Sequence, residues 1–409
     1  MLINRVLLNV TSIAQLLISP FQGYLCNEIA SLFLDVYHQK EIFMFSINWY
    51  TILIIIYVLL LMHSKSQTNQ DIRYGEIVKS DFRPPWWATN RHVQTIFPRF
   101  IQKRAKLDYR KEKLVLPDGD FVNLIWAGDV QKSSGIIAMF HGLEGSIRSH
   151  YTNDIAANFV KQGYAVVLMH FRGCGGEHNA TPRAYHSGET QDAWYFLNWL
   201  EQKFPEIRKA AMGFSLGANM LLKLLSEQPK QQILKAAMAV STPFNLALCA
   251  TSINQGFSRV YQAYLLKSMV KNLLIKMRNM DYGKLIKVTE SQIEQFRHFR
   301  DFDEHITAPI HGFVDADDYY QKCSSQNFIK GIATPTLVIH AKDDPFMHKS
   351  IVPDAAVLSP SVCLEVSEKG GHVGFMQGTP WRPKIWMHQR ANTFFEPFIA
   401  DKSKHLFTG

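Results

Sequence analysis

The stretch GFSLG at residues 213–217 decides the fold of this chain. The residues before it, 208–212 (RKAAM), are typical of the end of a β-strand, and residues 218–225 (ANMLLKLL) place apolar side chains on one face of a helix. A serine between a strand and a helix, with a glycine two positions away on either side, is typical of a nucleophile elbow, whose tight turn exposes the hydroxyl. We therefore predict that Ser215 is a catalytic nucleophile. The alternative is a glycine-rich turn with an inert serine.

Strand-like and helix-like segments alternate on both sides of this elbow. Strands are expected at 121–126, 135–140, 164–171, 235–240, 335–340 and 361–366, and helices at 154–161 and after Ser187, which we expect to cap its helix. This alternation predicts an α/β fold with a mostly parallel central sheet covered by helices on both faces. Residues 242–330 interrupt it with helix-like runs such as 261–276, so we expect a helical cap inserted above the active-site edge.

A nucleophilic serine needs a base to accept its proton and an acid to orient that base. In folds with this elbow, the chain order is serine, then Asp or Glu, then His. The glycine-rich segment 367–375 (SEKGGHVGF) follows an expected strand and contains His372, which we predict to be the base. Its alternative is a loop histidine with only local hydrogen bonds.

Two adjacent aspartates, Asp343 and Asp344, follow the strand at 335–340. Asp344 directly precedes a proline and a phenylalanine, which is the usual position of the acid in hydrolases of this architecture, so we favour Asp344 as the third catalytic residue. Asp343 would then hold the loop by bonding its backbone, as short acidic side chains do in turns.

The oxyanion hole needs a second amide besides the one that follows the nucleophile. The segment 140–145 (FHGLEG) follows an expected strand at the point where such folds place that donor. We predict that the amides of Leu143 and Leu216 form the oxyanion hole. His141 is expected to have a structural role.

No cofactor is expected. The segment 172–176 (RGCGG) lacks the G-K-[ST] of a phosphate loop, and the histidines show no metal-ligand spacing, so we predict no metal. The five cysteines are scattered without a C-x-x-C pair, which indicates neither a disulfide framework nor a zinc site. A formal net charge of +9 favours anionic surfaces, but no nucleic-acid recognition motif accompanies it.

Residues 42–62 form an uncharged run of 21 residues, the length an α-helix needs to cross a bilayer. We predict one transmembrane helix there, within a membrane segment at 1–65. Basic residues after the run weakly favour a cytoplasmic catalytic domain. Two further basic segments, 99–113 and the cap near 271–287, are interpreted either as contacts with anionic lipid or as ordinary surfaces.

These patterns divide the chain into the membrane segment, a polar tether and N-terminal arm at 66–120, and a hydrolase domain at 121–400 with its cap at 242–330. Four separated motifs then resemble the YheT-like branch of the α/β-hydrolases, also called the AB hydrolase 4 family. They are PPWWATNRHVQTI at 84–96, HGLEGS at 141–146, HFRGCGG at 170–176 and GFSLGAN at 213–219. The resemblance implies an α/β-hydrolase fold, a serine triad and esterase or lipase activity on acyl esters.

The sequence therefore predicts a membrane-tethered serine carboxylesterase or lipase whose substrate is a small-molecule or lipid acyl ester. Ser215, Asp344 and His372 would form the triad. Two alternatives stay open. The same site would be an acyltransferase or ester synthase if an alcohol accepts the acyl group, and a non-catalytic membrane adaptor would keep only the fold.

Overall fold

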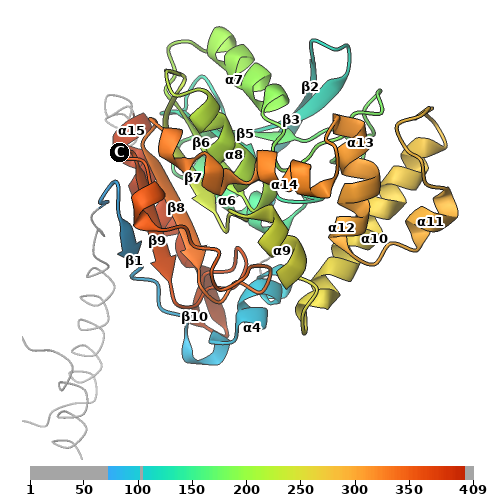
Figure 1. Cartoon of the computed structure of the whole chain (residues 1–409). Coiled ribbons are helices and arrows are strands. Elements are labelled where there is room, and N and C mark those ends of the chain that lie inside the picture. Colours follow the sequence, from blue (N-terminus) through green and yellow to red (C-terminus); the bar gives the residue numbers. More distant parts are fainter. Residues whose placement is uncertain (1–71, 102–104, 401–409) are drawn as a thin grey trace, which may run out of the picture. The chain divides into compact units, whose positions relative to one another are not determined.

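The computed structural model describes residues 72–101 and 105–400. Within these ranges, nine strands form one twisted sheet in the order β1-β9-β8-β7-β6-β4-β5-β3-β2 (Figure 1). The strands are β1 Ile77–Lys79, β2 Tyr109–Val115, β3 Phe121–Ala127, β4 Ile136–Phe140, β5 Ala165–His170, β6 Lys209–Phe214, β7 Leu234–Val240, β8 Thr336–Ala341 and β9 Val362–Ser367. Only the β2–β3 and β3–β5 pairs of this sheet are antiparallel. The predicted mostly parallel sheet is confirmed.

Helices cover both faces of this sheet, so its central strands are buried on both sides. In β4, Ile136, Ala138 and Phe140 point to one face and pack against α7 (Gln191–Lys203) and α8 (Leu216–Glu227). Ile137 and Met139 point to the other face and pack against α6 (His150–Lys161) and α15 (Trp386–Ile399). The resulting three-layer arrangement places the carboxyl ends of the parallel strands at a common edge.

The segment between β7 and β8 is helical. It contains α9 (Leu246–Ser252), α10 (Ser258–Met277), α11 (Glu290–Glu294), α12 (Phe299–Phe302), a π-helical turn (Asp303–Thr307), α13 (Ala308–His311) and α14 (Ala316–Cys323). These helices enclose two small apolar clusters of their own. They also line a cavity that reaches Ser215, so this segment covers the carboxyl edge of the sheet.

Two local expectations differ from the structure. Residues 77–79, which we placed in the polar tether and N-terminal arm at 66–120, form β1 and pair in parallel with β9. Only Val78 of this strand is buried, so its pattern is too short to be recognised in sequence. The helix expected after Ser187 begins later, at Gln191, and the Ser187 amide donates to the hydroxyl of Tyr319.

The N-terminal arm adds the short helices α4 (Arg91–Ile96) and α5 (Pro98–Ile101), and a hairpin of β10 (Met376–Thr379) and β11 (Arg382–Ile385) follows the His372 loop. Among residues 72–101 and 105–400, no helix has the length and apolar character required to cross a bilayer. The transmembrane helix predicted at 42–62 lies outside the described residues.

Candidate active site

Ser215 lies in a strained turn between β6 and α8. Its backbone has φ 50° and ψ −116°, a conformation that L-residues rarely adopt. The flanking glycines leave no room for a side chain: a Cβ on Gly213 would lie 2.6 Å from the carbonyl oxygen of Gly217, and one on Gly217 would lie 2.5 Å from that of His141. The Ser215 amide donates to the carbonyl of Val240 at the end of β7, at 2.9 Å. Neighbouring strands thus fix a serine at the carboxyl edge of the sheet.

His372 and Asp344 are in direct contact. The imidazole Nδ1 lies 2.7 Å from Asp344 Oδ2, and the Asp344 carboxylate is almost completely buried just beyond the end of β8. The other carboxylate oxygen accepts a hydrogen bond from the Phe346 amide at 2.8 Å. Because a carboxylate accepts from Nδ1–H, the proton sits on Nδ1 and Nε2 remains an acceptor.

Asp343 has a different partner. Its carboxylate accepts from the Gly371 amide at 3.0 Å, directly before His372, and burial raises its pKa above the ordinary value. Of the two aspartates, the structure therefore places Asp344 on the imidazole and Asp343 on the backbone of the histidine loop.

The end of β7 connects the serine to the histidine loop. Val240 accepts from the Ser215 amide, and the next residue, Ser241, accepts from the amide of Val373 at 3.0 Å. Within the described residues, no hydrogen bond joins the Ser215 hydroxyl to His372. Catalytic hydrogen bonds are often long or poorly aligned without substrate, so this arrangement is compatible with proton transfer between the two side chains.

The N-terminal arm holds the histidine loop in place. Thr95 Oγ1 accepts from the His372 amide at 3.0 Å, and the Gln94 side chain bonds both the N–H and the C=O of Met376, at 2.7 and 3.2 Å. Gly374 is required beside them, because a Cβ there would lie 2.1 Å from the Gln94 carbonyl. Sequence reasoning missed these roles, although both residues lie in the motif at 84–96.

The candidate oxyanion loop approaches Ser215 closely. A Cβ on Gly142 would lie 3.3 Å from the Cβ of Ser215, which is a tight contact, so the glycine eases this close approach of the backbone. Across residues 72–101 and 105–400, neither the Leu143 amide nor the Leu216 amide donates a hydrogen bond. Leu143 and Leu216 also line the cavity above the serine. These two amides are therefore available to an oxyanion.

His141 has the structural environment expected of it. Its Nδ1 donates to the Gly142 carbonyl at 2.7 Å, and its Nε2 accepts from the Phe171 amide at 3.1 Å. Burial lowers its pKa to about 4, so the ring is neutral near pH 7 and uses both nitrogens to support the loop.

Glu144 joins the oxyanion loop to the cap, which the sequence did not suggest. Its backbone has φ 55°, and one carboxylate oxygen accepts from the Tyr185 hydroxyl at 2.9 Å. The other oxygen accepts from Ser268 at 2.8 Å and Asn272 at 2.5 Å, both on α10. The residue after Leu143 is thus fixed directly to a cap helix.

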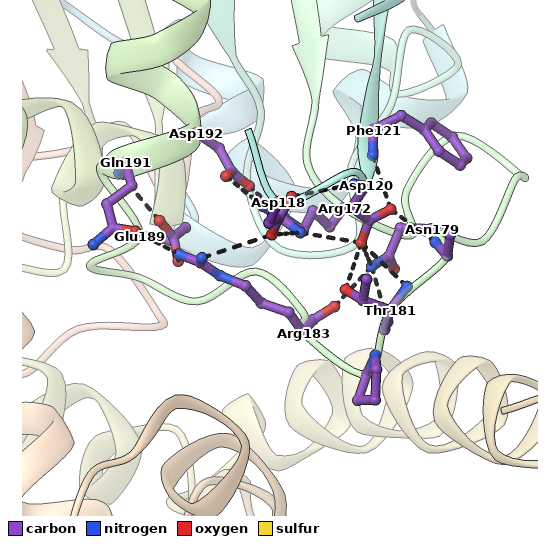
Figure 2. A network of polar contacts seen from close by, with 12 residues as sticks. Asp118, Asp120, Phe121, Arg172, Asn179, Thr181, Arg183, Glu189, Gln191 and Asp192 are labelled. Carbon is purple, nitrogen blue, oxygen red and sulfur yellow. Dashed lines mark hydrogen bonds and ion pairs between the residues drawn. The ribbon is translucent and has the colours of Figure 1, made fainter. Parts of the chain in front are cut away.

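The HFRGCGG motif contributes a buried ion network rather than a phosphate loop (Figure 2). Arg172 forms a bidentate pair with Asp192 at 2.6 and 2.7 Å and contacts Asp118 and Asp120 at 2.8 and 3.0 Å. Although burial opposes it, hydrogen bonds from Thr181 and other groups hold the pKa of Asp120 well below its usual range. The network fixes the segment 172–192, part of which lines the cavity.

The cavity above Ser215 is mostly apolar, with polar groups at separate points. Its apolar lining includes Leu246, Ile253, Leu265, Met269, Leu273 and Ile306. Among its polar groups, burial raises the pKa of Asp303 to about 6, and burial lowers the pKa of Lys276 to about 8. Such a lining suits an acyl chain placed beside the serine.

One cluster in the described part of the chain has the composition of a metal site: His186, Glu189 and His311, whose ligand atoms lie within 4.8 Å of one another. Glu189 already pairs with Arg183 at 2.7 Å, and His186 Nδ1 accepts from the Gly188 amide at 3.1 Å. Neutral His186 consequently carries its proton on Nε2, which blocks that nitrogen as a ligand. We assign no metal to this cluster.

Comparisons with known proteins agree with this architecture. Residues 135–379 match the family model described as "alpha/beta hydrolase fold". A protein of Escherichia coli called putative esterase YheT is 42% identical over 326 residues, which cover 79% of this chain and 95% of that protein. The monoacylglycerol lipase of Saccharomyces cerevisiae is 33% identical, over 59% of this chain and 55% of its own length.

More distant matches include phospholipase ABHD3 of Bos taurus, which is 26% identical over 79% of this chain and 80% of its own length. Among solved structures, the esterase Pf2001 of Pyrococcus furiosus superposes with a TM-score of 0.49 at 18% identity, covering 78% of this chain and 98% of its own.

Proposed function

The chain belongs to the α/β-hydrolases, in their YheT-like branch, and on that premise we propose that it is a serine hydrolase that cleaves carboxylic esters through an acyl-enzyme. The observation that carries the proposal is the 2.7 Å contact between His372 Nδ1 and Asp344 Oδ2, at the same sheet edge as the strained Ser215. That contact leaves His372 Nε2 as the base.

In the proposed acylation step, the Ser215 hydroxyl attacks the ester carbonyl while His372 Nε2 accepts its proton. The new C–O bond gives a tetrahedral oxyanion that the amides of Leu143 and Leu216 stabilise. Asp344 stabilises the imidazolium that forms. His372 then protonates the leaving alcohol, and the acyl group remains on Ser215.

In deacylation, His372 Nε2 accepts a proton from water while the water oxygen bonds to the acyl carbon. The bond between that carbon and Ser215 Oγ then breaks, His372 returns its proton to Oγ, and the carboxylic acid leaves. The apolar lining of the cavity supports an acyl chain as the bound part of the substrate. The names of two relatives, a monoacylglycerol lipase and a phospholipase, support a lipid ester as the substrate class.

The same acyl-enzyme would transfer its acyl group to an alcohol in place of water. Product ratios in water–ethanol mixtures distinguish a hydrolase from an ester synthase, because the two acceptors compete for one intermediate. A non-catalytic adaptor would have no use for the Asp344–His372 contact and would show no turnover.

The proposal includes a membrane tether. The uncharged run at 42–62 supports a single span, and the weak excess of basic residues after it supports a cytoplasmic catalytic domain. Carbonate extraction of membranes and protease protection of sealed vesicles test the two statements separately. Extraction of the full chain by carbonate would contradict the span.

A fluorophosphonate probe tests the nucleophile. We expect it to label the wild-type protein and the exposed-serine control Ser350→Ala, but not Ser215→Ala, and we expect p-nitrophenyl ester hydrolysis to follow the same order. Circular dichroism of Ser215→Ala checks that the fold is intact. Equal labelling of Ser215→Ala and wild type would refute the assignment.

A further inference from the structure

Three segments far apart in sequence expose large apolar side chains at the end of the molecule that carries α4 and β10. They are the arm around α4 and α5, the first half of α10, and the tip of the β10–β11 hairpin (Figure 1). Six residues define what we call the aromatic face: Trp86 (81% exposed), Phe100 (73%), Phe257 (51%), Val260 (55%), Tyr264 (59%) and Trp381 (77%). Clustered exposed groups of this size mark interaction sites.

Direct contacts join these segments into one surface. Trp87, next to Trp86, donates from Nε1 to the Gly378 carbonyl of the hairpin at 3.0 Å. Arg99 donates to the Tyr264 hydroxyl at 3.0 Å, and its guanidinium lies 5.3 Å from the centre of that ring. The arm therefore touches both the hairpin and α10.

All three segments carry positive charge and no carboxylate. Residues 82–107, 256–280 and 369–395 contain no Asp or Glu. Arg99, Arg259, Lys267, Lys271 and Arg382 are exposed within them. Three unrelated pieces of chain thus bring the same sign of charge to one surface, which favours an anionic partner.

Helix α10 has two distinct faces. Val260, Tyr264, Lys267 and Lys271 recur at helical spacing and are exposed. The opposite face carries Leu265, Met269 and Asn272, which line the cavity. One helix therefore separates the substrate cavity from an amphipathic outer surface.

The aromatic face also reaches the active site through a series of ring contacts. The ring centroids of Phe257 and Tyr261 lie 5.8 Å apart, and those of Tyr261 and Phe346 lie 5.0 Å apart. The ring of Phe346 in turn stacks on His372 at 4.0 Å. The surface is therefore contiguous with the histidine side of the site.

We propose that the aromatic face docks the catalytic domain onto an anionic lipid bilayer. Tryptophan and tyrosine favour the interface between headgroups and acyl chains, and lysine and arginine beside them attract anionic headgroups. A nucleic acid or an acidic protein would satisfy the charge, but neither would give Val260 and the tryptophans an acyl environment. Docking would present the histidine side of the cavity to the bilayer.

The test uses the full chain reconstituted into vesicles whose lipids carry brominated acyl chains, which quench tryptophans in contact with them. Trp86→Phe/Trp381→Phe is the reference, because it keeps the other six tryptophans, including Trp49 in the expected span. We expect wild type to show additional quenching over this reference in vesicles with one quarter phosphatidylserine. This additional quenching should weaken in pure phosphatidylcholine and in 1 M salt, where the Debye length falls to about 3 Å.

Charge reversal gives the second comparison. Each basic residue near an anionic surface contributes roughly fivefold in partitioning, so Arg99→Glu/Arg259→Glu should reduce the equilibrium constant for docking by more than about 20-fold. The matched control, Lys132→Glu/Lys230→Glu, changes exposed lysines next to the amino end of β4 and the carboxyl end of α8, and it should leave that constant unchanged. Thermal unfolding checks that both variants fold.

This readout does not depend on turnover, so it is separate from the test of the proposed function. Equal quenching of wild type and Trp86→Phe/Trp381→Phe would overturn the proposal. So would quenching that ignores the anionic lipid, or equal effects of the two charge reversals. Binding of a nucleic acid or an acidic protein with no bromolipid quenching would assign the face to that partner instead.

Discussion

The phenyl ring of Phe346 lies flat on the imidazole of His372, with ring centroids 4.0 Å apart and planes inclined by 5°. Phe346 follows Asp344 by two residues, and its amide donates to the same carboxylate that contacts His372. One short turn after β8 therefore fixes the imidazole in two ways, through its Nδ1 and across its face.

We expect Phe346→Leu to lower kcat about tenfold, because an imidazole free to tilt spends less time aligned with Ser215. Phe346→Tyr keeps a planar ring and should retain most of the activity. Met347→Leu is the control, since Met347 is the next residue in the chain and also lines the cavity. Equal losses in Phe346→Leu and Met347→Leu would attribute the effect to cavity shape.

We expect substitutions of the two aspartates to lower kcat by very different amounts. Asp344→Asn should reduce kcat by roughly 10³–10⁴, because an amide no longer stabilises the imidazolium or selects its tautomer. Asp343→Asn should cost less than about tenfold, because its carbonyl oxygen still accepts from Gly371. Steady-state hydrolysis of a soluble ester measures both variants, and the reverse ranking would exchange their roles.

The hydrogen bonds from α10 to Glu144 lead us to expect coupling between the cap and the oxyanion hole. Glu144→Gln and Asn272→Leu should each lower kcat about tenfold with little change in KM, because both release the backbone beside Leu143. The double variant should show an interaction energy of about 0.5–3 kcal/mol, as groups in contact do. Asn279→Ala, on an exposed asparagine just beyond the end of α10, is the matched control. Additive losses would argue against the coupling.

Two arginines with bidentate aspartate partners differ in burial and in the number of carboxylates that they contact. Arg172 is 1% exposed in its ion network, and Arg300 is 50% exposed in its pair with Asp317. Arg172→Lys leaves buried carboxylates incompletely paired and should lower the free energy of unfolding by about 3–5 kcal/mol. Arg300→Lys should cost less than about 1 kcal/mol. Denaturant unfolding measures both, and similar losses would contradict the importance of burial.

The burial of His340 leads us to expect that the folded protein loses stability in acid. His340 is fully buried in β8, and burial lowers its pKa to about 4 although the nearby Asp344 charge opposes this. Between pH 6.5 and about 4 the unfolded chain binds a proton that the folded chain does not, so stability falls as the pH falls through this window. At pH 5 the loss is roughly 2 kcal/mol.

His340→Leu should remove that loss. The unfolding free energy of the variant minus that of wild type should be about 2 kcal/mol higher at pH 5 than at pH 8. Urea unfolding at the two pH values measures the gain. If the difference in unfolding free energy between His340→Leu and wild type is the same at both pH values, His340 binds its proton as readily in the folded protein as in the unfolded chain.

The sequence by itself determined the fold class and the chain order of the candidate triad. The elbow at 213–217 and the alternation of buried strands with amphipathic helices are local patterns, and local patterns repeat with the period of the element that they form. For the acid, the sequence only favoured Asp344 over Asp343, through the proline and phenylalanine that follow Asp344.

Only the tertiary structure decided what holds those residues together. The Thr95 hydroxyl bonds the His372 amide across 277 positions, and Glu144 bonds Asn272 across 128. Such contacts join single polar groups without periodicity, so one sequence contains no signal for them. The pairing of β1 with β9 and the assembly of the aromatic face have the same origin: folding brings distant segments together, and their shared charge and exposure become visible only then.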